Sequence, residues 1–333
     1  MLGPMLGSVL LLAAGCSARE GSDAATASAC STAVGYRAQQ IGGRTVALWY
    51  PTSVAPTPFA YGPQFSSVLA HDAPPTRACG AAVPLVVFSH GDLGCGLQSV
   101  TFTEELARHG YVVAAPDHAD AALCHTPMSG SSLPSAPPAQ PPILRPQAWS
   151  EESRQDRRQD VESVIDELLA DREFASVIDA QRIGLAGHSL GGYTVVGIAG
   201  GWPSWKDARV RAVLALSPYV MPFQVQKTLS DVHIPIMYQG GTLDVGITPF
   251  LRGPQGAFAA AQAPAYLLVL RAAGHFAWVN CGHEHTTQAC LEHVADARLA
   301  AQYGIAFFDR HLKGLPAPQL DRADARLALY EHK

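Results

Sequence analysis

Apolar runs recur along the chain, and each ends in a polar or glycine-rich turn. Five of them have the unbroken apolar character of strands that are buried on both faces of a sheet: Val83–Ser89, Tyr111–Ala115, Val210–Leu216, Ile234–Tyr238 and Tyr266–Leu270. Another strand is expected at Thr45–Tyr50, and amphipathic helices are expected at Thr101–His109, Ser150–Phe174 and Asp296–Leu312. Strands separated by helices predict an α/β fold with a mainly parallel sheet and helices on both faces.

The other segments predict a single domain with two long loops. No internal repeat and no second core is visible, so residues 32–333 are expected to form one domain. Residues 51–82 carry many prolines and few periodic apolar positions, which favours an irregular loop. Residues 124–149 are rich in Pro, Ser and Gly and leave the end of a predicted strand. Such loops are uncommon unless they are functional, so this one is either a lid or pocket wall, or a solvent-exposed insertion.

A serine lies between two glycines at the end of a further apolar run. The residues are Gly187-His188-Ser189-Leu190-Gly191, with a strand pattern before them and a helix pattern after them. This is the pattern of a nucleophile elbow, in which a tight turn leaves room only for glycine on either side and presents the serine oxygen at a helix N-terminus. An ordinary glycine-rich turn is the alternative, because the pattern alone is short.

An acid and a base follow the elbow in the required order. Asp244 and His275 each come just after a predicted buried strand, and the order Ser, Asp, His is the one that α/β-hydrolases use. His275 would take the proton of Ser189, and Asp244 would hold the imidazole in the useful tautomer. Finding both residues at strand ends makes an ordinary turn a much weaker explanation.

The remaining site residues are expected near these three. The oxyanion hole would use the N–H groups of Leu190 and Asp92, the second from the loop after Val83–Ser89, with the Asp92 carboxylate pointing away. Four residues are candidates for the substrate pocket: His188, Tyr219, Phe276 and Trp278. Core packing is the alternative for Phe276 and Trp278, and a structural role is the alternative for His188. Three further histidines are expected to be structural: His90, His118 and His125.

Composition limits the classes of binding partner that are expected for this protein. The net charge of −5 and the lack of a basic block argue against binding to nucleic acid. The predicted chemistry needs no cofactor and no metal, so the expected partner is a small-molecule ester substrate. A cluster of Cys281, His283, His285 and Cys290 matches no zinc signature. The sequence does not predict an oligomeric state.

The N-terminus predicts export. Residues 1–15 are uncharged and apolar, too short for a membrane span, and typical of a signal peptide. Small residues before Cys16 resemble a lipoprotein box, although no Lys or Arg precedes the run and Ala13 stands where leucine is usual. Lipidated Cys16 would then be followed by a tether over residues 16–31, in the periplasm or on the outer surface. A buried N-terminal strand or a wrongly assigned start codon is the alternative.

Six further cysteines fit an exported protein with three disulfides. Cys281 with Cys290 is the first expected pair, because the loop between them is short and polar. Cys95 with Cys124 and Cys30 with Cys79 follow by elimination, although six cysteines allow about 15 pairings and the sequence does not choose among them.

Four segments resemble a known family: F-S-H-G-D-L-G, E-L-A-R-H-G-Y-V-V-A-A-P-D-H-A-D, R-I-G-L-A-G-H-S-L-G-G and A-L-S-P-Y. They are similar to the platelet-activating-factor acetylhydrolase group and to bacterial dienelactone-hydrolase-like proteins. The resemblance extends from about Val83 to the last helix. It implies an α/β-hydrolase fold and a calcium-independent serine hydrolase without a cofactor, acting on short or modified acyl esters.

One departure separates the chain from the animal acetylhydrolases. They take their acid from the strand after the elbow helix, where this chain has Ser217, so Asp244 on the next strand must serve here. The substrate of the animal enzymes is therefore not expected to be the substrate of this chain. Dienelactone hydrolases use cysteine where this chain has Ser189, and cutinases share the layout. The alternatives to a small-ester hydrolase are a polyester hydrolase, an amidase, and a non-catalytic surface lipoprotein on the same scaffold.

Overall fold

The computed structural model describes residues 1, 3, 33–62, 65–122 and 140–333. Contacts divide the chain into Met1–Cys30 and Ser31–Lys333, and the fold below is that of the second unit. Several predictions lie outside the described residues: the signal peptide, Cys16 and its tether, Cys30, Cys124, His125 and most of the loop over residues 124–149.

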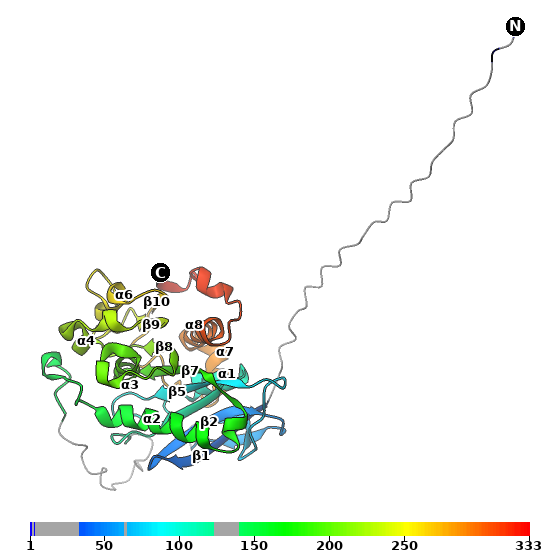
Figure 1. Cartoon of the computed structure of the whole chain (residues 1–333), viewed down its shortest axis with the longest axis horizontal. Coiled ribbons are helices and arrows are strands. Elements are labelled where there is room, and N and C mark those ends of the chain that lie inside the picture. Colours follow the sequence, from blue (N-terminus) through cyan, green and yellow to red (C-terminus); the bar gives the residue numbers. More distant parts are fainter. Residues whose placement is uncertain (2, 4–32, 63–64, 123–139) are drawn as a thin grey trace. The chain divides into compact units, whose positions relative to one another are not determined.

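In the described part of the chain, eleven strands form one sheet in the order β11-β10-β9-β8-β7-β5-β6-β2-β1-β4-β3 (Figure 1). The six strands from β10 to β6 in this order are parallel, and antiparallel pairs join β11 and β2 to either side of them. The strands are β1 Ala33–Ile41, β2 Arg44–Thr52, β3 Thr57–Ala60, β4 Ser66–His71, β5 Val83–Ser89, β6 Val112–Pro116, β7 Ile178–His188, β8 Val210–Leu216, β9 Ile236–Gly241, β10 Ala265–Leu270 and β11 Leu327–His332.

Helices cover both faces of this sheet and divide its core in two. Apolar side chains of α2 and α3 pack on one face, and those of α1 and α8 on the other. The α-helices are α1 Val100–Arg108, α2 Gln155–Ala170, α3 Leu190–Val196, α4 Met221–Gln226, α5 Thr248–Leu251, α6 Ala257–Ala260, α7 Thr287–His293 and α8 Ala295–Leu312. Short 3-10 helices occupy Pro146–Ala148, Phe174–Ser176, Pro203–Trp205, Leu229–Asp231 and Pro318–Asp321, and a π-turn occupies Gly197–Gly201.

The predicted α/β-hydrolase fold is confirmed. Val83–Ser89 and Val210–Leu216 are the observed β5 and β8, because helices cover both sides of the central strands and every position of these two strands except Arg211 is buried. The carboxyl ends of parallel strands meet at one edge of a sheet, where ligand sites of this fold class form. The loops after β5, β7, β8, β9 and β10 therefore gather at that edge.

Two predictions are wrong in detail. Residues 51–82 are not irregular throughout, because β3 and β4 form an antiparallel pair within them. The pair lies at the outer end of the sheet, where Pro58 needs no N–H for a further neighbour. The helix predicted over Ser150–Phe174 spans only Gln155–Ala170, since Arg154 has a left-handed φ of 61° and Asp171 is extended.

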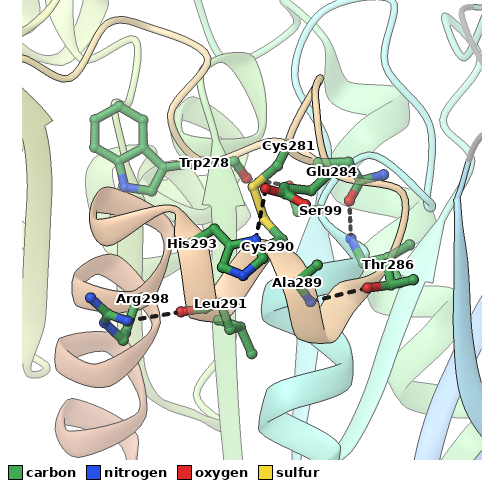
Figure 2. Close-up of a disulfide and its surroundings, with 12 residues drawn as sticks. Ser99, Trp278, Cys281, Glu284, Thr286, Ala289, Cys290, Leu291, His293 and Arg298 are labelled. Carbon is green, nitrogen blue, oxygen red and sulfur yellow. Dashed lines mark hydrogen bonds and ion pairs between the residues drawn. A yellow bond between two sulfur atoms is a disulfide. The ribbon is translucent and has the colours of Figure 1, made fainter.

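The predicted disulfide between Cys281 and Cys290 is confirmed (Figure 2). Its Cα atoms are 5.8 Å apart, and it ties the loop after β10 to α7, whose first turn is capped by the Thr286 hydroxyl. The other two predicted pairs each include a cysteine outside the described residues, although neither Cys79 nor Cys95 has a free thiol. None of the helices in the described ranges has the length and apolar character that a bilayer span requires.

Candidate active site

Ser189 occupies a sharp turn between β7 and α3. Its φ of 56° and ψ of −114° are strained for a residue with a side chain. A Cβ atom on Gly191 would overlap the Ser89 carbonyl oxygen, and one on Gly187 would overlap the Gly191 carbonyl oxygen. Only glycine fits at both positions, so the backbone geometry of a nucleophile elbow is present at the carboxyl edge of the sheet.

The structure brings the three predicted residues into one hydrogen-bonded chain. Ser189 Oγ lies 2.9 Å from His275 Nε2, and His275 Nδ1 lies 3.0 Å from Asp244 Oδ2. Asp244 follows β9 and His275 follows β10, so neighbouring parallel strands deliver the acid and the base to the elbow after β7. Asp244 is buried, whereas the His275 side chain remains 28% exposed and is open to a substrate.

Ser217 joins the same chain, which the sequence did not predict. Its Oγ donates a hydrogen bond to Asp244 Oδ2 and lies 2.9 Å from His275 Nδ1. Ser217 follows β8, between the strands that carry Ser189 and Asp244. In the sequence, position 217 is notable only because it carries no acid. No local motif marks a serine as a neighbour of a triad.

Hydrogen bonds keep Asp244 ionised. Burial acts to raise the pKa of Asp244, but hydrogen bonds from His275 and Ser217 outweigh it and hold that pKa below its usual value. The carboxylate is therefore charged at neutral pH, as a partner of the His275 Nδ1–H group must be.

The loop after β5 lies against the elbow. A Cβ atom on Gly91 would be 3.4 Å from Ser189 Cβ, so this loop passes within contact distance of the predicted nucleophile. The N–H groups beside Asp92 are taken by side chains, that of Gly91 by Gln98 at 2.9 Å and that of Leu93 by Asp120 at 3.4 Å. The Asp92 carboxylate pairs with Arg154 at 3.2 Å.

The buried Arg157 of α2 holds the loop after β5 in place. Arg157 donates to the carbonyl oxygens of His90 and Gly91, at 2.7 and 3.1 Å, and to both carboxylate oxygens of Asp120. Burial opposes ionisation of Asp120, but the Arg157 charge and its hydrogen bonds outweigh burial and lower the Asp120 pKa. The sequence pattern could have indicated that Arg157 is buried, because Arg157 lies on the apolar face of α2 with Val161 and Val164.

His90 and His118 belong to the same buried network, as expected for structural histidines. His118 contacts the Ser89 hydroxyl at 2.8 Å and Asp160 at 2.9 Å, and its backbone N–H donates to His90 Nε2. Burial, with the nearby Arg157 charge, holds the pKa of both rings well below the usual value. Both imidazoles are therefore neutral and orient the loop after β5.

His188 links this loop to the base. Its Nδ1 accepts from Gln98 Nε2 at 2.9 Å, and its Nε2 donates to the His275 carbonyl oxygen at 2.8 Å. Burial, followed by repulsion from His275, lowers the pKa of His188 to about 4. Protein groups occupy both ring nitrogens, so His188 offers a substrate no free hydrogen-bonding atom.

The other three pocket candidates occupy different environments. Tyr219 is buried beside the elbow, with its N–H on the Ser189 carbonyl oxygen and its hydroxyl on the Ile143 carbonyl oxygen. Phe276 is 73% exposed next to His275. Trp278 is buried and donates to Gln239 at 2.9 Å, which is core packing, the alternative weighed for it.

Four large apolar residues next in sequence to candidate site residues are exposed. Leu243 and Val245 flank Asp244, Phe276 follows His275, and Leu93 follows Asp92.

Nothing in the described residues supports the metal alternative. No group of three or more His, Cys, Asp or Glu side chains is arranged there to hold a metal ion. Cys281 and Cys290 are joined to each other, and His293 at the end of α7 contacts Glu284 at 3.0 Å (Figure 2).

Comparison with known proteins indicates the same family resemblance as the four sequence motifs. The sequence model of the family "Platelet-activating factor acetylhydrolase, isoform II" matches residues 70–162, which include β5, the loop around Asp92 and Arg157. The platelet-activating factor acetylhydrolase of Cavia porcellus is 28% identical over 178 residues, covering 46% of this chain and 38% of that protein. The alignment thus spans well under two thirds of the relative's length. This chain has the α/β-hydrolase fold and resembles the platelet-activating factor acetylhydrolases.

Proposed function

We propose that this protein is a serine hydrolase that cleaves carboxylic esters through an acyl-enzyme on Ser189. The observation that carries the proposal is the hydrogen-bonded chain from Ser189 through His275 to Asp244 at a strained elbow. The similarity to an acetylhydrolase family supports the same reaction class. Short or modified acyl groups are the proposed substrates.

The first half-reaction uses His275 as a base. Its Nε2 accepts the Ser189 proton while Oγ attacks the ester carbonyl carbon, and Asp244 stabilises the imidazolium that forms. His275 then returns the proton to the departing alkoxide, which leaves the acyl group on Ser189. In the second half-reaction a water molecule loses its proton to His275 and attacks the acyl carbon, and Ser189 leaves with that proton.

The proposed oxyanion hole consists of the N–H groups of Leu190 and Asp92. Leu190 begins α3, so its N–H has no acceptor within the helix. The Asp92 N–H lies between two amides that bond to side chains, in a loop that Arg157 holds by its carbonyl groups. The pairing of the Asp92 carboxylate with Arg154 keeps its charge engaged away from the hole.

A series of p-nitrophenyl esters of increasing acyl length tests the proposal, together with labelling by a fluorophosphonate. We expect turnover of acetate and butyrate esters, and labelling that Ser189→Ala abolishes. The matched control is Ser67→Ala, which removes another buried serine hydroxyl, far along the chain at the sheet's outer end. Absence of both turnover and labelling in the wild-type protein would favour a non-catalytic binding protein.

Two further comparisons separate the related activities. Faster turnover of an amide than of the matched ester would identify an amidase, and release of soluble products from a polyester film would identify a polymer hydrolase.

We propose in addition that the protein is exported and that Cys16 is its lipid attachment point. The Cys281–Cys290 disulfide supports an oxidising compartment. Expression of the full chain in a bacterium with labelled palmitate tests the anchor: incorporation into wild type but not Cys16→Ala is expected. Export without label in either protein would contradict lipidation alone, whereas retention in the cytoplasm would contradict export.

A further inference from the structure

We infer that Ser217 is a positioning residue of the acid–base pair. The inference rests on the proposed function, because it assigns a role within the same hydrolytic site. Its basis is that one hydroxyl contacts both partners of the pair, the Asp244 carboxylate and the His275 imidazole.

The donors and acceptors at this contact have only one consistent arrangement. His275 Nε2 must accept from Ser189, so the ring proton is on Nδ1. That proton faces Asp244 Oδ2 at 3.0 Å and Ser217 Oγ at 2.9 Å and is shared between them. The Ser217 hydroxyl then donates its own proton to the carboxylate, which can only accept. The hydroxyl therefore ties acid and base together.

The backbone holds this hydroxyl firmly. Ser217 is fully buried, and its N–H donates to the Gln239 carbonyl oxygen at 2.7 Å, which joins the end of β8 to β9. Its φ of 43° lies in the left-handed region, which a residue with a side chain occupies at a cost. Such strain persists where the surrounding structure imposes it, and here it directs the side chain into the triad.

The first experiment removes the hydroxyl with Ser217→Ala. We expect kcat to fall by about 10- to 100-fold, the effect of losing a hydrogen bond to a charged group, with KM changed by less than about threefold. Ser67→Ala is the matched control, because its hydroxyl also donates to a buried carboxylate, that of Glu104 at 2.6 Å, but lies away from the site. A kcat for Ser217→Ala within about twofold of wild type would overturn the inference, as would an equal loss in Ser67→Ala.

A second measurement observes the His275 imidazole directly and does not depend on turnover. The proton on His275 Nδ1 can be followed by NMR as a downfield resonance, which Ser217→Ala should shift and Ser67→Ala should not. Failure of the proposed function would appear as an unlabelled wild-type protein whose resonance still responds to Ser217→Ala. An unchanged resonance in Ser217→Ala would overturn the inference even in an active enzyme.

Discussion

Asp244 is the residue that we propose as the acid of the triad. Its carboxylate is buried and accepts hydrogen bonds from two groups, which stabilise its charge. We expect Asp244→Asn to lower kcat by about 10⁴, because the amide favours the wrong tautomer of His275. Steady-state kinetics on a p-nitrophenyl ester measure this. An Asp244→Asn protein close to wild type would show that another group serves as the acid.

Buried neutral histidines make the stability of the fold depend on pH. The pKa of His188 is about 4 in the folded protein, against about 6.5 in an unfolded chain. Between these values the unfolded state binds more protons, so the free energy of unfolding should decrease as the pH falls from 6.5 to 4. His90 and His118 act in the same direction.

Denaturant unfolding at a series of pH values measures this dependence. We expect His188→Gln to remove up to one proton from the difference between the two states, which lowers the slope by up to about 1.4 kcal/mol per pH unit. A slope that His188→Gln leaves unchanged would mean that His188 is already charged in the folded protein.

At the scale of elements, the loop after β5 depends on α2. Arg157 is the contact between them, and its guanidinium reaches two carbonyl groups and Asp120 at once. Lysine keeps the charge but cannot match this fork. We therefore expect Arg157→Lys to lower kcat by about 10- to 100-fold, approaching the cost of a lost oxyanion donor.

Arg158 provides the control on the same helix. It is partly exposed and pairs with Glu162 one turn later, so Arg158→Lys should leave kcat near wild type. Equal kcat values for the two variants would show that the loop after β5 does not need Arg157 to hold its active geometry.

The elements also differ in how well the sequence predicts them. β5 and β8 were predicted to the residue, because strands buried on both faces favour apolar side chains, with Arg211 the one exposed position in these two strands. β3 and β4 were missed, because a short pair at the sheet's outer end is buried on few positions and includes Pro58. Ser189, Asp244 and His275 could be identified from strand ends in the correct order. Ser217 could not, because no local motif marks a serine that contacts both Asp244 and His275.

At the scale of the whole molecule, the Cys281–Cys290 disulfide stabilises the segment between the base and α8. The loop that it closes spans nine residues of sequence separation, which corresponds to about 2–3 kcal/mol in the chain-entropy account. We expect Cys281→Ala with Cys290→Ala to lower the free energy of unfolding by about this amount, as measured by denaturant titration. Fluorophosphonate labelling of Ser189 should persist. Loss of labelling in a folded double variant would mean that the disulfide also positions His275.

The hydrogen-bond chain from Gly91 through Gln98 and His188 to His275 has a direction. In each link a donor faces an acceptor. The unprotonated Nδ1 of His188 determines which group of each residue donates and which accepts. A proton added at Nδ1 would turn the Gln98 amide around, and its NH₂ group would then meet the Gly91 N–H, donor against donor. Acid would thus break the chain at its Gly91 end, while the His188 Nε2–H group would still donate to the His275 carbonyl oxygen.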